Sequence, residues 1–344
     1  MKNKIIATLV AFGLVGSASA IEINENLSIN GFIDGSYKST DFNDKSSPGS
    51  GGDSTDIGLD EIELDFLFSA GAARGELHLD SAVENDDDQL DIEQVHLSFD
   101  FEGGLSLTAG VFGSALGLDR EDPGGLYTFS RAFTSQDALD TATAGTPLAG
   151  SRGFNLGNVD AYQQEGMRIT YTADQFSASL AAFNGVGTLE ETAGTPGSED
   201  DLDWELAIAF TGIENLALGG GVQTNNESNN AALNQGADTT IINVHGAYTM
   251  GKALIAAEWS NIDADNTTAP DRDAYQIVVD YDVSDVLGFA VRYAEEDSVV
   301  TAGQNADSVT IAPNYKISDN LGAILEYSNI NHANEDDEDY LAVE

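Results

Sequence analysis

Apolar and polar residues alternate along many short stretches of this chain, from about Leu27 to Val343. In the segment 202–210 every second position carries a large apolar residue, in the order Trp204, Leu206, Ile208 and Phe210. Successive side chains of a β-strand point to opposite faces, so such a strand has one apolar and one polar face. Many such strands in series favour a closed barrel with an apolar outside and an aqueous inside.

Sixteen segments carry this alternation, and they predict an all-β fold, a transmembrane antiparallel β-barrel of sixteen strands. No Pro/Gly-rich linker divides the chain, so we expect residues 21–344 to form one barrel domain. The last segment stops in mid-strand at Glu344, and we expect that strand to be incomplete. The predicted strands are Leu27–Tyr37, Leu59–Phe68, Arg74–Val83, Ile92–Phe101, Leu105–Phe112, Met167–Thr172, Phe176–Phe183, Leu202–Thr211, Leu216–Gln223, Thr239–Thr249, Lys252–Ser260, Ala274–Tyr281, Leu287–Ala294, Ser308–Lys316, Leu321–Ser328 and Tyr340–Glu344.

The connections between these segments alternate in length. Tight ones such as Met250-Gly251 follow long polar ones such as Thr224–Asp238 along most of the chain. Strict alternation places all tight turns at one end of the barrel and all long loops at the other. Outer-membrane barrels have this arrangement, with short periplasmic turns and long extracellular loops.

The N-terminus has the pattern of a secretory signal peptide. Lys2 and Lys4 precede an apolar stretch, Ile5–Val15, and small residues Ser17–Ala20 follow it. This predicts a signal peptide over residues 1–20 that is cleaved after export. An exported barrel with an apolar outside is expected in the outer membrane of a Gram-negative bacterium.

Charge and cysteine content narrow the range of functions. The chain has no cysteine, and its 13 Lys and Arg stand against 59 Asp and Glu, a net charge of −46. Such a field excludes nucleic acid as a partner. Two interpretations of the acidity stay open, namely solvation in salty surroundings and attraction of cations at a channel mouth.

Aromatic residues gather near the strand ends on the apolar face, where two girdles flanking an aliphatic band are typical of membrane barrels. The general preference of aromatic residues for β-strands is the alternative explanation. The candidate girdle residues are Tyr37, Trp204, Phe210, Tyr248, Trp259, Tyr275, Tyr281, Tyr293, Tyr315 and Tyr327.

The segment Gly113–Gly166 is far longer than the other connections. A long insertion in a compact domain indicates either a functional loop or a wrong strand assignment. Its charged residues are candidates for a pore constriction, namely Asp119, Arg120, Glu121, Asp122, Arg131 and Arg152. Its aromatic residues Tyr127, Phe129 and Phe133 are candidates for a stacking track.

The chain resembles the general porins of Gram-negative outer membranes at this point. The strand Leu107–Phe112 and the following Leu116-Gly117-Leu118 look like the family's strand entering its third loop. The resemblance implies a homotrimer and a third loop folded into the lumen, where acidic loop residues face basic wall residues. It makes Asp119, Glu121 and Asp122 the acidic candidates and makes Arg74, Arg168 and Arg292 the wall cations.

The polar faces of the predicted strands supply candidates for the pore wall. Acidic residues at every second position of one strand share a face, which here is the lumen side. The candidate wall residues are Glu61, Glu63, Asp65, Arg74, Glu76, His78, Arg168, Asp203, Glu205, Glu258 and Arg292. Basic residues are too sparse among them for strong anion selectivity.

Enzymatic and metal-binding motifs are missing from the sequence. It contains no H-E-x-x-H, P-loop or G-x-S-x-G motif, and we expect no enzyme. Asp86–Asp88 and Glu335–Asp339 could hold Ca²⁺ or Mg²⁺ loosely in external loops, but neither has EF-hand spacing. We therefore expect no cofactor and no specific metal site, and the solvated loop is the alternative role of these clusters.

These observations predict a porin that forms a water-filled channel for the passive diffusion of small hydrophilic solutes and ions. The acidic wall favours cations. Lipid and lipopolysaccharide are the expected surroundings of the barrel. Two alternatives stay open: a substrate-specific channel for sugars or carboxylates, and a structural or adhesive barrel without transport.

Overall fold

The structure is a computed structural model of the whole chain. It describes residues 20–43, 54–82, 91–118, 128–130, 132, 163–184, 202–225, 239–264, 272–298, 306–332 and 337–344. Within these ranges, no helix is long and apolar enough to cross a membrane. Residues 1–19 of the predicted signal peptide and most of the long connections lie outside them.

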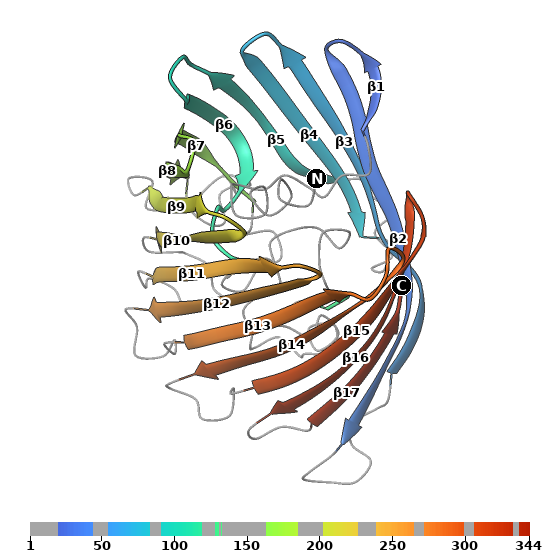
Figure 1. Cartoon of the computed structure of the whole chain (residues 1–344). Helices are drawn as coiled ribbons and strands as arrows, with labels where there is room; N and C mark the ends of the chain where they lie inside the picture. The colour runs from blue at the N-terminus through green and yellow to red at the C-terminus, as the bar shows by residue number, and fades with distance from the viewer. Residues whose placement is uncertain are drawn as a thin grey trace, which may run out of the picture.

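Sixteen strands, β2 to β17, form a closed antiparallel barrel (Figure 1). Each strand pairs with its neighbours in the sequence, and β17 pairs with β2 to close the ring. The predicted all-β barrel of sixteen strands is confirmed. The strands are β1 (Ile21–Asn24), β2 (Leu27–Asn43), β3 (Ser54–Ala70), β4 (Ala73–Ala82), β5 (Asp91–Asp100), β6 (Leu105–Gly113), β7 (Gln163–Thr172), β8 (Phe176–Phe183), β9 (Asp203–Ile213), β10 (Leu216–Asn225), β11 (Thr239–Met250), β12 (Ala253–Ala264), β13 (Arg272–Asp282), β14 (Leu287–Ser298), β15 (Ala306–Ser318), β16 (Leu321–His332) and β17 (Asp337–Val343).

Tight turns at one end of the barrel join the strands in pairs, from β3–β4 to β15–β16. Gly71 and Gly251 lie in two of these turns with positive φ angles of 66° and 63°. Glycine adopts this left-handed backbone without steric cost, which is why hairpin turns favour it. Asn215 has the same conformation in the β9–β10 turn, with φ 63°.

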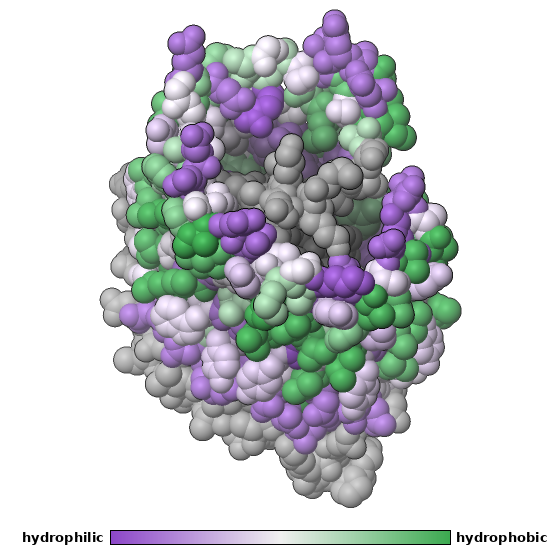
Figure 2. All heavy atoms as spheres, in the orientation of Figure 1, coloured by the Kyte–Doolittle hydropathy of each residue, from purple (hydrophilic) through white to green (hydrophobic). Residues whose placement is uncertain are grey.

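The two faces of each strand differ as the alternation predicts. Along β9 the burial alternates, with Asp203 and Glu205 buried and Trp204, Leu206 and Ile208 about half exposed. The exposed apolar side chains therefore form the outer face of the barrel. In Figure 2 apolar residues are spread over the visible wall and hydrophilic ones stand at the strand tips.

The inner face is not uniformly polar. Small apolar residues are buried together on β9 to β15, where Leu118 and Ile324 pack against them. This cluster consists of Ala209, Ala217, Ala247, Leu254, Ala256, Val278, Ala290 and Ala312. Alternation distinguishes apolar from polar positions, whereas alanine fits either face, so the sequence pattern did not reveal this inner patch.

Several strands are longer than predicted, because they continue into segments that we expected to be loops. β2 reaches Asn43 and β17 begins at Asp337. Asp337, Glu338 and Asp339 of the predicted acidic loop therefore lie in a strand, and Glu338 is buried. Strand ends are the least certain part of a prediction from alternation, because polar residues suit both loops and the rims of a barrel.

The barrel closes along the edge of β2. β17 pairs with residues 37–43 of β2, and the short β1, which we did not predict, pairs with residues 27–29. Glu344 continues the pairing beyond β17, since its backbone exchanges two hydrogen bonds with Ile324 of β16. The seven residues of β17 are therefore sufficient to join β16 to β2.

Candidate functional site

The chain turns into the barrel after β6 (Figure 1), and residues 114–118 are bound to the inner wall. Glu205 of β9 is the first anchor. Its carboxylate accepts hydrogen bonds from Ser114 Oγ at 2.5 Å and from the amide of Ala115 at 3.1 Å. Glu205 is fully buried, so these bonds replace the water that its charge would otherwise require.

Arg168 of β7 completes this first anchor. One guanidinium nitrogen donates to Glu205 Oε1 at 3.1 Å and to the carbonyl of Gly113 at 2.7 Å. The guanidinium also lies 4.5 Å from the centre of the Phe112 ring, which is within the range of a cation–π interaction. The arginine thus holds the end of β6 and the start of the loop against β9.

A second anchor follows two residues later on β11 and β12. The amide of Gly117 donates to Asn243 Oδ1 at 3.2 Å, and the amide of Leu118 donates to Glu258 Oε1 at 3.0 Å. Asn243 also donates to Glu258 at 2.7 Å, which orients both acceptors toward the loop backbone. Side chains of the wall therefore accept hydrogen bonds from two backbone amides of the loop, Gly117 and Leu118, which lie outside the strands.

The loop touches the inner wall again at residues 128–130, on β14. Arg292 donates to Thr128 Oγ1 at 2.7 Å, to the Ser130 carbonyl at 2.5 Å and to Ser130 Oγ at 2.8 Å. It is buried, and it also donates to Thr310 Oγ1 of β15 at 3.2 Å. The planar guanidinium can serve several acceptors at once, as this position requires.

Glu326 of β16 is the last anchor. It accepts from the amide of Ser130 at 3.1 Å and from Ser130 Oγ at 2.5 Å. The ring of Phe129 stacks on Tyr340 of β17, with centroids 6.3 Å apart. Residues 114–118 and 128–130 of the loop are therefore bound to the inner wall at β9–β12 and at β14–β17, inside the barrel.

Apolar packing supports the first part of the loop. Leu116 is 2% exposed and lies in a buried cluster with Ala115 and Ala207. Gly221 of β10 faces it, and a Cβ at that position would lie 2.7 Å from Leu116 Cδ2. A side chain there would therefore displace either the loop or the strand.

The predicted site residues fall into three groups. All six charged loop candidates (Asp119, Arg120, Glu121, Asp122, Arg131 and Arg152) lie outside the described residues, as do Tyr127 and Phe133 of the stacking track. Four wall candidates, Arg168, Glu205, Glu258 and Arg292, meet at the loop anchors. The others lie elsewhere on β3, β4 and β9, and Arg74 pairs with Asp100 at 2.8 Å near a turn, where both side chains are about half exposed.

The aromatic candidates lie on the outward face of their strands. Eight of them are more than a third exposed, and Phe210 and Tyr293 are half-buried. Tyr275 contacts Tyr293, with ring centroids 6.2 Å apart. Their role as a membrane girdle stays a prediction.

Five anchoring residues were not predicted as site residues from the sequence: Ser114, Thr128, Ser130, Asn243 and Glu326. Ser114 and Glu205 are 91 positions apart in the chain, and Ser130 and Glu326 are 196 apart. No local pattern marks such pairs, because they meet only when the barrel closes. For Asn243 and Glu326 a signal was present, since they have the inward parity of β11 and β16.

Comparisons with known proteins agree with this architecture. A family model described as Gram-negative porin matches residues 7–335. No curated protein matches the chain.

Three solved structures, each less than 25% identical to this chain, share the fold. An anion-selective porin from Comamonas acidovorans is 10% identical with a TM-score of 0.65, over 92% of this chain and 98% of that one. The outer membrane channel DcaP of Acinetobacter baumannii is 12% identical with a TM-score of 0.61, over 96% and 99%. The trimer form of OmpT, an outer membrane protein of Vibrio cholerae, is 15% identical with a TM-score of 0.55, over 93% and 99%.

Proposed function

Since this chain belongs to the Gram-negative porin family, we propose that it is a water-filled channel for the passive diffusion of small hydrophilic solutes and ions, with a preference for cations. The family and the barrel support a channel in the outer membrane. The solutes, the passive mechanism and the ion preference are our proposal.

The observation that carries the proposal is the loop bound inside the barrel. Its hydrogen bonds to Glu205, Asn243, Glu258, Arg292 and Glu326 hold it against the inner wall on both sides of residues 119–127. A loop held in this way narrows the bore, and the narrowing limits the size of the solutes that pass. An anchor or adhesin has no need of a loop fixed within its lumen.

The sign of the buried wall charges supports the cation preference. Two of the buried charged side chains in the described residues are basic, Lys38 and Arg292. The buried acidic ones are Glu63, Asp65, Asp203, Glu258, Glu296, Glu326 and Glu338, together with Glu205, whose charge Arg168 largely matches. In a wide pore the sign of the wall charges decides which ions enter.

Conductance in planar lipid bilayers tests the channel. Folded protein should produce stepwise currents, and the reversal potential in a salt gradient should correspond to cation flow. Anion preference would contradict the ionic part of the proposal, and the absence of conductance from correctly folded protein would contradict the whole of it.

Replacement of residues 114–162, between the end of β6 and the start of β7, by a short turn distinguishes the channel from a barrel without transport. If this segment narrows the bore, its deletion should raise the single-channel conductance. Unchanged conductance would show that the loop does not constrict the pore.

A substrate-specific channel is the second candidate, favoured by the stacking of Phe129 on Tyr340 in the inner wall. Aromatic rings offer flat apolar surfaces to sugars. Currents that a sugar or a carboxylate blocks in a saturable manner would support this candidate over a general pore.

We also propose a homotrimer, as in the trimer form of the Vibrio cholerae protein. Lipid and lipopolysaccharide would surround the outer face. Native electrophoresis of the detergent-folded protein, with and without cross-linking, measures the oligomeric state. In this proposal the chain has no enzymatic activity.

A further inference from the structure

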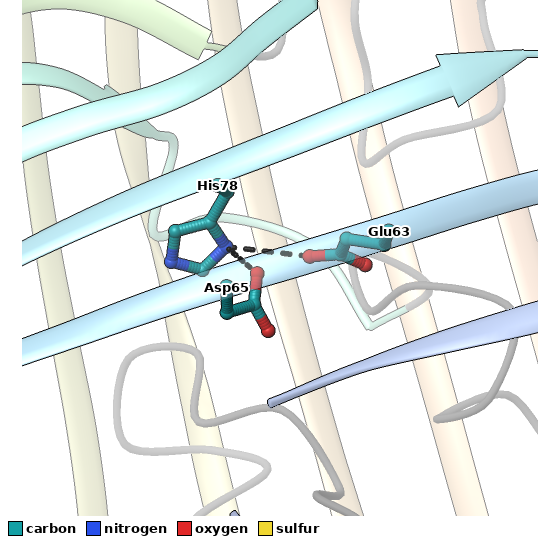
Figure 3. Close-up of side chains that lie close together, drawn as sticks. All are labelled: Glu63, Asp65 and His78. Atoms are coloured by element: carbon teal, nitrogen blue, oxygen red, sulfur yellow. Dashed lines mark ion pairs between the residues drawn. The ribbon is translucent and has the colours of Figure 1, made fainter. Parts of the chain in front are cut away.

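A second group of inward side chains lies on β3, β4 and β5, apart from the loop anchors. The tight turn at Gly71-Ala72 fixes the β3–β4 register, so that Asp65 pairs with His78. Glu63 precedes Asp65 by two residues and therefore shares its face. Side chains directly opposite across two strands come within contact distance, and all three converge here (Figure 3).

The distances within this group match those between ligands of a metal ion. His78 Nδ1 lies 3.1 Å from Asp65 Oδ1 and 3.4 Å from Glu63 Oε1. In a tetrahedral site with bonds of about 2.0–2.1 Å, two ligand atoms are about 3.3 Å apart. A point near these three atoms is therefore suitably placed for a small divalent cation.

Burial and hydrogen bonding give a second, independent observation. Asp65 is 2% exposed and His78 is 5% exposed. Both ring nitrogens of His78 and Asp65 Oδ1 are buried atoms that make no hydrogen bond, despite these short approaches. Buried polar atoms without a hydrogen bond are costly, and a bound cation would satisfy His78 Nδ1 and Asp65 Oδ1.

Glu76 occupies the position of a supporting carboxylate. Its Oε2 lies 3.5 Å from His78 Nε2 and 3.7 Å from His96 Nε2. An imidazole that binds a metal through one nitrogen almost always directs its other nitrogen to a carboxylate or similar acceptor. His78 therefore has ligands beside Nδ1 and an orienting group beside Nε2.

We propose that Glu63, Asp65 and His78 form a binding site for a divalent transition-metal ion in the barrel wall, with Glu76 as a positioning residue. One imidazole and two carboxylates suit Zn²⁺, whereas Mg²⁺ and Ca²⁺ prefer oxygen ligands alone. The two carboxylates also balance the charge of the ion. This site differs from the acidic clusters Asp86–Asp88 and Glu335–Asp339, and it does not depend on the channel function.

Zn²⁺ titration of the full-length, detergent-folded protein tests the site by calorimetry after chelator treatment. We expect one Zn²⁺ per chain, without competition from Mg²⁺ at a similar concentration. His78→Gln and Asp65→Asn should each abolish this binding. Glu76→Gln should weaken it about 10–100-fold, as the loss of an orienting partner does.

His245→Gln is the matched control, since His245 is also buried in the barrel wall, on β11, but bonds to Asn243 instead. It should bind Zn²⁺ like the unchanged protein. Circular dichroism and heat-modified gel mobility show whether each variant is folded. If neither ligand variant folds, X-ray absorption of the Zn²⁺-loaded natural protein decides, and it should show one imidazole with oxygen ligands.

Two results would overturn the proposal. One is the absence of stoichiometric Zn²⁺ binding to the folded natural protein, which would indicate that a proton on His78 balances the carboxylates instead. The other is Zn²⁺ binding that is equally strong in His78→Gln, or an absorption spectrum without imidazole.

Discussion

Glu205 illustrates how burial decides the role of a charged residue in this barrel. It is fully buried, and its partners Ser114, Ala115 and Arg168 are all hydrogen-bond donors. A carboxylate in water would attract mobile ions, whereas this one is bound to protein groups. Its principal effect is therefore to hold the loop, and its charge is largely matched by Arg168.

Glu205→Gln should lower the free energy of unfolding by about 3 kcal/mol or more, because the amide would direct an N–H toward donors and leave Arg168 without its carboxylate. Urea unfolding in detergent, followed by tryptophan fluorescence, measures the change. Asp100→Asn is the control, since Asp100 pairs with Arg74 at a half-exposed site, where a pair contributes about 0–1 kcal/mol. Equal losses in the two variants would contradict the assignment of Glu205 as an anchor.

Arg292→Lys should free the second part of the loop, although it keeps the positive charge. A lysine cannot serve Thr128, Ser130 and Thr310 together in the geometry of the guanidinium. We expect a loss of about 1–3 kcal/mol in unfolding free energy and noisier single-channel currents. Arg74→Lys, at a half-exposed position, should leave both measurements close to those of the natural protein; steady currents from Arg292→Lys would argue against this anchor.

At the scale of the element, successive side chains of each strand alternate between the inside and the outside of the barrel, with a period of two residues. On β9 the inward carboxylate of Glu205 binds the loop while the outward side chains remain exposed. A shift of register by one residue would exchange the two faces, which makes the register strongly determined in a barrel. The tight turns help to set it, as Gly71-Ala72 does for β3 and β4.

Ile208→Lys places a charge on the outward face in the middle of β9, where Ile208 is 52% exposed. If lipid covers this face, the charge should destabilise the barrel by about 2–4 kcal/mol. Val283→Lys is the matched control, because Val283 is 46% exposed but lies in a tight turn. Reversible unfolding in lipid vesicles gives both values, and an equally small effect of the two variants would mean that lipid does not contact β9.

At the scale of the whole molecule, the net charge of −46 acts together with the shape of the barrel. The closed ring has a bore partly occupied by its own loop. A bore of this kind exposes passing ions to fixed charges at short range, and the excess of acidic groups sets the sign of the field.

The cation preference should therefore decrease as the salt concentration rises. The Debye length is about 10 Å in 0.1 M salt and about 3 Å in 1 M salt, so concentrated salt screens the fixed charges from most of the bore. Reversal potentials across a tenfold gradient, measured at low and at high mean concentration, check this expectation. A selectivity independent of salt would indicate that a narrow ion-binding site, rather than the general field, chooses the ion.

Much of the molecule followed from the sequence by itself. Alternation is a local property, because neighbouring side chains of any strand point to opposite sides. It therefore predicted the barrel and the outward placing of residues such as Trp204 and Ile208. It also gave Ala290 the inward parity of Arg292, but it did not show that alanines of several strands form one apolar patch inside the barrel, since a small side chain suits either face.

The Glu63–Asp65–His78 group depends on both local and tertiary structure. Its members are at most 15 residues apart, and the turn at Gly71-Ala72 pairs them. The register of that hairpin could have been derived from the sequence, but the burial that makes the group suitable for a metal ion could not.

Only the tertiary structure decided where residues 114–118 and 128–130 of the long connection lie. The partners of Ser114 and Ser130 are far away in the chain, on strands that come near the loop only when β17 closes against β2. Residue types alone could not separate Glu205, which binds the loop, from a carboxylate that faces water. The difference arises from desolvation and from hydrogen-bond donors that distant segments supply, and these exist only in the folded barrel.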